Sequence, residues 1–335
     1  MAIYENIKLE KGLYTTGKSF TEALEELDPS ENYVGTELEG LDAYQRQLKR
    51  FSIRVSGRGS DRVEKFFKTS DSAALFPEYI SRAVRQGMEE NDILGSIVAT
   101  TTDIDSLDYR TITSVPGEDD RQLKVVNEGA FIPSTEIKTQ ENLVKLHKRG
   151  RMLVASYEAV RFQRLDLFTV TLRQIGAYIA KSRLKDAVDV LMNGDGNSNA
   201  ITETKAATEG TLTYGDLVDF WNSFDPYTLN VVIASPSMMA KLLKLSEFRD
   251  AAAGLSFHST GELVTPFGAK LMKSSAVAAD KLIGLDRTCA LELVQAGGIS
   301  TEFDKLIDRQ LERAAITSIA GFAKIYTPAS KALSL

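Results

Sequence analysis

The chain has 335 residues, of which 43% are hydrophobic and 26% charged, and its formal net charge is −6. This length is long for one compact domain and predicts two lobes, or one lobe with extensions. The acidic balance argues against a general nucleic-acid binder, and the single cysteine, Cys289, excludes an intramolecular disulfide and a thiolate metal cage.

The first seventy residues predict an extended arm that carries two short helices. In "SFTEALEELDP", Ser19 and Glu22 have capping-box spacing, and Pro29 ends the segment. Apolar residues follow helical spacing in both segments: Phe20, Ala23, Leu24 and Leu27 in the first, and Leu41, Tyr44, Leu48 and Phe51 in "ELEGLDAYQRQLKRF". Each stripe is too narrow to hold a helix in water. Both helices therefore need a partner surface, from this chain or from a neighbouring one.

Residues 55–62, "VSGRGSDR", predict a flexible and mildly basic linker, with a phosphate contact as the alternative. In the next segment, "LFPEYISRAVRQG", Pro77 marks the start of a helix and Gly87 is expected just past its end. The segment "ILGSIVATTTDI" then predicts a buried β-branched strand.

Residues 105–150 predict a long two-stranded hairpin with a polar tip. The segments "LDYRTITSV" and "EIKTQENLVKLHKRGRMLVAS" alternate as strands do, and a charged stretch rich in Gly and Pro joins them. We interpret Glu118, Asp119 and Asp120 as a solvated tip rather than a metal cluster, because consecutive carboxylates in a strand-rich turn point apart. Since a two-stranded ribbon is marginal in isolation, the hairpin is expected to lie on another surface, most simply another subunit.

Residues 157–192 carry the strongest periodic signal in the chain and predict one long spine helix. This stretch has no proline and a single glycine, Gly176, where a kink is a candidate. Apolar residues share one face, with Arg183 as the single polar break: Phe168, Leu172, Ile175, Ile179, Ala187 and Leu191. At about 1.5 Å per residue a straight helix would be roughly 54 Å long.

The stretch "LMNGDGNSNA" follows the spine and resembles a ligand loop at first sight. As a calcium loop it fails, because Ser198 and Thr204 stand where a glycine and a bidentate glutamate are needed. As a phosphate cradle it lacks a following lysine and lies at the negative end of a helix. It fits a helix terminus, in which Met192 ends the spine and Asn193–Gly194 take left-handed angles. We therefore predict the junction between two domains.

An α/β pattern occupies the rest of the chain. The segment "TYGDLVDFWNSF" predicts a helix with Trp221 in the core, "LNVVIAS" a buried strand, and "PSMMAKLLKLSEF" a helix with Pro236 in its first turn. A short strand is expected near Lys270–Lys273, and further strands in "LIGLDRTCALELVQAGGISTEFDK". The tail predicts a strand from Ala314 to Ile325 rather than a helix.

No catalytic, cofactor-binding or metal-binding residue is predicted. His147 and His258 are far apart and lack partners at metal-ligand spacing, and we assign structural roles to His258 and Cys289. The phosphate-loop, dinucleotide, zinc-protease and nucleophile-elbow motifs do not occur, although a carboxylate-only or lysine-based enzyme stays open.

No apolar run approaches the length that crosses a membrane, and the start lacks a signal-peptide pattern, so a cytoplasmic product is the default.

The order of these parts resembles the major capsid protein of tailed bacteriophages, whose shell fold is shared with encapsulin nanocompartments. The resemblance covers about residues 72–328. "LFPEYISRAVRQG" is similar to the opening helix of the family, and "VNEGAFIPSTEIKTQENLVKLHKRGRMLVASYEAV" resembles its descending hairpin strand and spine start. "LMNGDG" is similar to its spine terminus, and "SPSMMAKLLKL" and "TPFGAKLMKSSAV" resemble its strand–Pro–helix unit and strand entry.

The resemblance implies an α+β phage major capsid fold with four parts. These are an N-terminal arm (1–70), an extended β-hairpin loop (105–150), a peripheral domain containing the spine helix (71–104, 151–195 and 291–324), and an axial α/β domain (196–290 and 325–335). It further implies that extended loops lie across neighbouring subunits. Hexamers and pentamers would then close into an icosahedral shell that encloses a double-stranded DNA genome.

The partners implied are further copies of the chain, a scaffolding protein, a portal and decoration proteins, with weak non-specific contact to packaged DNA and none to a membrane. The protein would reside in the virion after assembly in the host bacterial cytoplasm. An encapsulin-type shell is the alternative function, and a soluble enzyme is a weaker one.

Two family features are not carried over. Some members have a long N-terminal scaffolding segment that a protease removes, whereas only the short arm precedes the family-like body here. We expect the arm to stay attached, with a separate scaffolding protein or with the arm itself as a clamp. Some members cross-link their subunits, but no lysine, acceptor and catalytic glutamate can be assigned in this sequence.

Overall fold

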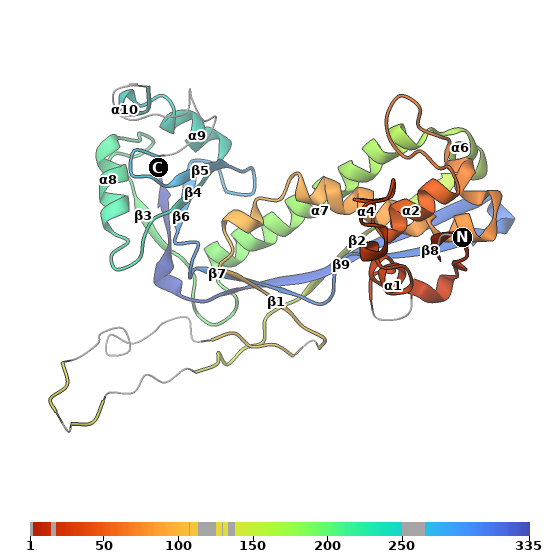
Figure 1. Ribbon diagram of the computed structural model, residues 1–335. Helices are drawn as coiled ribbons and strands as arrows, with labels where there is room; N and C mark the ends of the chain where they lie inside the picture. Colours follow the sequence, from red (N-terminus) through yellow and green to blue (C-terminus); the bar gives the residue numbers. More distant parts are fainter. Residues whose placement is uncertain are drawn as a thin grey trace. The chain divides into compact units, whose positions relative to one another are not determined.

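The computed structural model describes residues 3–14, 18–106, 108–112, 125–128, 130–132, 138–249 and 265–335. The chain divides into two compact units (Figure 1). The first unit consists of Met1–Asn91, Arg149–Ala180 and Ile299–Ser318, and the second of Asp92–Lys148, Lys181–Gly298 and Ile319–Leu335. Helices and sheets both occur, so the predicted α+β class is confirmed.

The first unit is mainly helical. Its elements are η1 (Ile3–Glu5), η2 (Lys11–Tyr14), α1 (Phe20–Leu27), η3 (Ser30–Tyr33), α2 (Ala43–Arg50), η4 (Val63–Lys68), α3 (Ser70–Ala74), α4 (Phe76–Glu89), α6 (Tyr157–Phe162), β8 (Ser300–Leu306) and η7 (Ile307–Arg309). Three long elements contribute residues to both units: β2 (His147–Ser156), α7 (Leu165–Asn193) and β9 (Leu311–Lys324).

The second unit combines strands from two sheets with short helices. Its elements are η5 (Leu94–Ser96), β1 (Thr100–Asp103), β3 (Thr202–Lys205), α8 (Tyr214–Asn222), β4 (Val231–Ala234), α9 (Pro236–Leu242), α10 (Ser246–Arg249), β5 (Lys270–Lys273), β6 (Lys281–Leu285), β7 (Leu291–Gln295), η8 (Thr327–Ala329) and β10 (Ser330–Ser334). The strands predicted near Lys270–Lys273 and in the tail are confirmed.

The N-terminal helices find their partner surface within this chain. Capping boxes begin α1 at Ser19 and α2 at Asp42, because each side chain accepts from the backbone N–H three residues on. Their apolar faces join the core of the first unit together with α4: Phe20, Leu24, Tyr44, Leu48, Ile80 and Val84. Leu27 was expected in the buried stripe but is 51% exposed, since it lies at the last residue of α1.

A fully buried arginine organises the segment between these helices. The Nε of Arg46 donates to Oδ2 of Asp28 at 2.7 Å, and its Nη1 donates to the carbonyl of Leu41 at 2.6 Å. The Tyr33 hydroxyl donates to the other Asp28 oxygen at 2.6 Å, and its ring lies 4.4 Å from the Arg46 guanidinium. Because both charges of this buried pair have hydrogen-bond partners, residues 28–46 form a folded segment.

Two glycines allow α4 and α7 to cross with their backbones in contact. A Cβ on Gly87 would lie 2.2 Å from the carbonyl oxygen of Arg173, and one on Gly176 would lie 2.0 Å from that of Val84. Gly87 therefore lies inside α4, whereas the sequence pattern placed it past the end of the helix. Gly176 lets the two helix backbones pack closely, and α7 continues through this residue without ending.

The spine helix is interrupted, so the prediction of one helix over residues 157–192 is wrong at its N-terminal end. Gln163 ends α6 in an extended conformation and its carbonyl accepts from Val63 N–H at 3.0 Å. The N–H of Leu165 donates to the carbonyl of Asp61 at 2.8 Å. This distant segment takes the hydrogen bonds that helix continuation would need. From Leu165 onward, α7 buries the predicted face, including Arg183, whose pKa is lowered by burial.

The described residues form two five-stranded sheets. One has the order β1–β7–β9–β2, with β8 also paired to β9; β1 is parallel to β7, and β9 is antiparallel to β7 and β8. The other lies wholly in the second unit, with the order β3–β10–β6–β4–β5. All four residues of β4 are buried, which explains its continuous apolar run, because core residues cover both faces.

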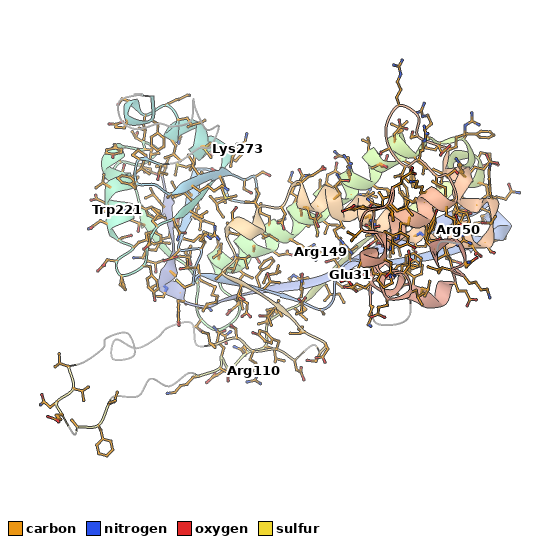
Figure 2. All side chains as sticks on the ribbon, viewed as in Figure 1. Glu31, Arg50, Arg110, Arg149, Trp221 and Lys273 are labelled. Atoms are coloured by element: carbon orange, nitrogen blue, oxygen red, sulfur yellow. The ribbon has the colours of Figure 1, made fainter. Side chains whose placement is uncertain are left out.

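Two further predictions are corrected. Only Thr100–Asp103 of "ILGSIVATTTDI" form a strand, and these residues are largely exposed, while Leu94 and Ile97 are buried in and beside η5. Trp221 lies on α8 (Figure 2) and is 44% exposed rather than in the core. Its ring stacks on Phe267 at a centroid distance of 5.5 Å. Trp221 therefore packs against another side chain at the surface of the unit. Among the described helices, none has the length and apolar character of a bilayer-spanning segment.

Candidate functional site: the base of the extended loop

The segment between β1 and β2 belongs to the second unit, and its described residues include two legs, 108–112 and 138–146 (Figure 1). It corresponds to the extended loop predicted for residues 105–150. At its base the two legs run antiparallel. Val144 N–H donates to Tyr109 at 2.9 Å, Gln140 N–H donates to Thr111 at 2.8 Å, and Ile112 forms a bridge with Thr139. The two legs therefore run together as predicted, but the predicted two-stranded ribbon is corrected: among the described residues the legs form only this isolated bridge, and the strand β2 that follows belongs to the sheet of β1, β7 and β9. The predicted polar tip, Glu118, Asp119 and Asp120, lies outside the described residues.

The outgoing leg is fixed by a buried carboxylate. Glu292 lies on β7 and is 4% exposed. It accepts hydrogen bonds from three hydroxyls, those of Thr102 at 2.5 Å, Tyr109 at 2.6 Å and Thr111 at 2.5 Å. Burial, and then the bond to Glu292, raise the pKa of Tyr109. Hydrogen bonds to a charged acceptor are the stronger kind, so this leg is firmly held on the sheet.

The "NGDG" corner after α7 forms a compact polar turn. Gly194 and Gly196 have positive φ angles of 84° and 100°, as is usual where a helix end reverses the chain. Of the predicted Asn193–Gly194 pair only the glycine is left-handed, because Asn193 is still the last residue of α7. The backbone N–H of Asp195 donates to Asn199 Oδ1 at 3.0 Å, and Asp195 Oδ1 accepts from Asn197 Nδ2 at 2.9 Å. The corner lies inside the second unit, where it leads from α7 toward β3.

This corner holds the return leg of the loop. The backbone N–H of Asn142 donates to Asn197 Oδ1 at 3.0 Å, and its side chain donates to the carbonyl of Gly196 at 2.8 Å. Gln140 also accepts from the Asn197 amide and donates to the carbonyl of Lys324 at 3.0 Å. The corner is therefore an anchor for the loop as well as the end of the spine.

Lys324 joins the strand β9 to the same anchor. Its backbone N–H donates to Oδ2 of Asp195 at 2.9 Å, and its buried Nζ donates to the carbonyl of Leu191 at 3.1 Å, near the end of α7. A cation is favoured at this end of a helix, because the last carbonyls have no partner within the helix. Burial nevertheless lowers the pKa of Lys324 to about 8, against the attraction of Asp195.

Apolar contacts complete the base. Buried side chains of the return leg, β7 and β9 form a small cluster, with half-buried residues around it: Val144, Val294 and Ala323, and Ile104, Tyr109 and Leu146. A Cβ on Gly321 would lie 2.3 Å from the carbonyl oxygen of Lys145, so β9 needs a glycine there to let the leg approach. Glu292 and the polar corner around Asp195, together with this apolar cluster, thus hold both legs of the loop.

A small cavity beside the anchor is lined by charged groups. Its volume is about 230 Å3, and Lys145, His147, Asp186 and Asp189 are among its lining residues. The Nδ1 of His147 lies 3.8 Å from Asp186 Oδ2, and the imidazole is half-exposed. Within the described ranges, no three His, Cys, Asp or Glu side chains gather as metal ligands would. His258 falls outside the described residues.

Beyond its base, the loop exposes large apolar side chains. Val125, Phe131 and Ile132 have exposed fractions of 99%, 101% and 81%. Several large apolar side chains that are exposed in one short segment are typical of a surface that a partner covers. The arrangement therefore combines a rigidly anchored base with an apolar distal part, which suits binding to another protein surface.

Sequence reasoning predicted the hairpin and the corner but missed the anchoring residues Glu292 and Lys324. The available signal was a charge inside an apolar strand, since "LELVQ" and "GFAKIY" each place one charged residue in an apolar run. A buried charge of this kind requires hydrogen-bond partners. Cys289 is half-buried, and burial raises the pKa of its thiol, which agrees with the structural role assigned to it.

Solved shell proteins have a similar fold. The chain is similar to a virus-like particle from Pyrococcus furiosus, with a TM-score of 0.51 and 13% identity over 77% of this chain and 98% of that chain. It is also similar to the capsid of a native GTA particle, with a TM-score of 0.53 and 12% identity over 72% of this chain and 89% of that chain. No curated protein sequence matches the chain.

A sequence model of one protein family matches residues 139–310, which is just over half of the chain. The match includes the return leg of the loop, the spine helix, the corner and most of the second unit's sheet. It therefore contains most of the residues that anchor the loop. The family is that of the phage capsid protein, and this chain belongs to it.

Proposed function

We propose that this capsid protein is the major head protein of a tailed bacteriophage, and that its hexamers and pentamers close into an icosahedral shell around double-stranded DNA. The observation that carries the proposal is the extended loop, whose base is fixed by Glu292 and Asp195 while Phe131 and Ile132 stay exposed. A lone subunit gains nothing from such a loop, whereas a neighbouring subunit would bury its apolar side chains.

The anchored base supports this function energetically. Ordering a flexible segment on binding costs free energy, so a loop that is already fixed at its base loses less conformational entropy when it docks. The distal residues and the surface they meet on the neighbour are different parts of the chain. Such contacts are heterologous, and they generate closed rings when the rotation between subunits closes.

We assign the capsid domains as follows. Residues 1–70 are the N-terminal arm and 105–150 the extended loop. The peripheral domain comprises 71–104, 151–195 and 291–324, and the axial domain 196–290 and 325–335. The folded segment around Arg46 supports an arm that stays attached to the subunit. In this assignment the corner after α7 joins the peripheral domain to the axial domain.

The proposed partners are other copies of the chain, a scaffolding protein, a portal and decoration proteins. Packaged DNA is contacted weakly and without sequence preference, which agrees with the net charge of −6. Assembly takes place in the host bacterial cytoplasm, and the product is the virion. The protein acts structurally, without a catalytic site or cofactor.

Electron microscopy of the purified full-length protein tests the proposal. Closed shells built from five- and six-membered rings are expected, and a monomer or an isolated small ring would overturn it. Particles from bacterial lysates separate the two kinds of shell. Nuclease-protected DNA of genome length identifies a phage head, and a protein cargo without DNA identifies an encapsulin-type compartment.

A further inference from the structure

We propose that the first unit of one copy inserts Phe162 and its neighbouring arginines into an acidic, apolar cavity on the first unit of another copy. This contact rests on the proposed shell function and is separate from the extended loop. Both halves of the contact lie within the first unit, and they are formed by different residues.

The receiving half is a cavity of about 630 Å3 between the N-terminal segment, α3 and the β8–β9 hairpin. Its apolar lining comes from Leu9, Phe67, Ala73, Ala74, Phe76 and Pro77. A dry apolar cavity of about 150 Å3 is enough to hold benzene. This cavity therefore has room for an aromatic side chain and for part of the backbone that carries it.

The rim of the cavity is acidic. Four carboxylates line it, those of Glu10, Asp71, Asp304 and Glu312, against one amine, that of Lys8. Two of the carboxylates have cationic partners, Glu10 with Lys8 and Asp304 with Arg313, and the rim keeps a net negative charge. A cavity with an apolar floor and a negative rim favours an occupant that combines an apolar side chain with positive charge.

The inserting half is the bend between α6 and α7. Phe162 is 61% exposed at the end of α6, and Leu167 and Val170 are 59% and 56% exposed at the start of α7. An exposed aromatic side chain with apolar neighbours is the typical anchor of a protein interface. The interruption of the spine helix therefore has a consequence for the surface, because it presents Phe162 outward.

Arginines surround this anchor. The loop before η4 lies against the bend: Arg62 forms a backbone bridge with Arg164, and Arg164 Nη2 donates to the carbonyl of Arg58 at 3.0 Å. These three arginines are exposed. Two carboxylates oppose them, Asp166 at 3.4 Å from Arg164 Nε and Asp61, which is itself paired with Lys65 at 2.9 Å.

A second copy of the chain fits this surface better than DNA does. Phosphates would satisfy the arginines but would leave Phe162, Leu167 and Val170 in water. The cavity satisfies both the charge and the apolar side chain. Because the two halves differ, each copy can give one and receive one, which suits a closed ring or shell.

Chemical cross-linking tests the contact directly. In full-length protein with Cys289→Ala, we would add Glu158→Cys on α6 and Ser70→Cys on the cavity rim, both at exposed positions. A short bis-maleimide should then link assembled chains into a ladder of dimers, trimers and higher species. Two single-cysteine proteins mixed before assembly should give dimers only. The control pair, Glu158→Cys with Glu26→Cys on α1, should give no ladder.

Shells in which the mixed single-cysteine proteins give no cross-linked dimer would overturn this contact and leave the proposed function standing, whereas the absence of any assembly would reject both. A second measurement reverses the charge on each side of the proposed contact. Arg58→Glu and Asp71→Arg should each lower the assembled fraction at least tenfold, and the double variant should restore it, while circular dichroism confirms folding. A loss of DNA binding by Arg58→Glu with unchanged assembly would assign the arginines to nucleic acid and overturn the contact.

Discussion

At the scale of single residues, buried charges hold the extended loop of this capsid protein. Glu292 accepts three hydroxyl hydrogen bonds from β1 and the outgoing leg, and Asp195 accepts from the corner and from β9. Such groups are costly to bury without partners and stabilising when all partners are present. The loop therefore depends on two acidic side chains that never reach the surface of the subunit.

Glu292→Ala should loosen the outgoing leg. The change leaves the hydroxyls of half-buried Thr102 and Tyr109 and of buried Thr111 without their acceptor. An unsatisfied buried group costs about 1–3 kcal/mol. We expect the free energy of unfolding of the unassembled subunit to fall by at least ~2 kcal/mol in urea titrations. Amide exchange at the loop base should become faster. Glu302→Ala, on the exposed face of β8, is the control and should change little; equal effects would contradict the anchor.

Lys324 predicts a specific dependence of stability on pH. Its folded pKa of about 8 lies below the ordinary value of 10.5, so between these two pH values the unfolded chain holds a proton that the folded chain has lost. Stability should therefore rise as the pH increases from about 8 toward 10, and the penalty of the buried charge is fully present below pH 8.

Lys324→Met should remove this rise. Urea unfolding of unassembled subunits between pH 7 and pH 10, compared with wild type, measures the difference in slope and cancels other titrating groups. Lys181→Met, at an exposed position on α7, is the control and should keep the wild-type slope. An unchanged slope in Lys324→Met would show that the amine stays charged when buried.

At the scale of elements, the crossing of α4 and α7 depends on two glycines. Helix propensity favours alanine over glycine by about 1 kcal/mol in a helix interior. Packing outweighs propensity here, because a Cβ on Gly176 would lie 2.0 Å from the Val84 carbonyl oxygen and the backbones would have to separate. A sequence pattern alone interprets these glycines as a kink and a helix end.

Gly176→Ala should destabilise the first unit by about 1–3 kcal/mol, the usual range for overpacking. The matched control is Gly215→Ala on α8, where the nearest atom to an added Cβ is 3.6 Å away. That change should stabilise the protein by up to about 1 kcal/mol. Thermal unfolding of both variants measures the contrast, and stabilisation by Gly176→Ala would refute the tight crossing.

At the scale of the whole molecule, the subunit is stable in parts and incomplete in others. The cores of the two units bury their apolar side chains, whereas the distal loop and the bend at Phe162 expose theirs. In the proposed shell, burial of these exposed groups would supply free energy of assembly at about 25 cal/mol per Å2 of apolar surface. Folding and assembly should therefore be separable by mutation.

The double change Phe131→Ser and Ile132→Ser should separate them. Both side chains are exposed in the subunit, so unfolding in urea should match wild type, while sedimentation should show subunits in place of shells. Val34→Ser is the control, since Val34 is 72% exposed in the N-terminal segment, and it should assemble normally. A folded double variant that still forms shells would exclude the distal loop from the interface.

The sequence by itself determined the local elements of this protein. Capping residues at Ser19, the apolar face of the spine and the glycines of the corner act over a few neighbours in the chain, so their pattern is sufficient. The alternation of the tail strand belongs to the same class. The order of these elements was specific enough to indicate the capsid family.

Only the tertiary structure decided the features that join distant residues. The spine breaks at Gln163 because residues 61–63 take its hydrogen bonds, and Gly87 lies inside α4 because α7 crosses it there. Glu292 and Lys324 anchor the loop because three or four separate segments meet around them. Contacts of this kind depend on which segments the fold brings together, and no local periodicity records that information.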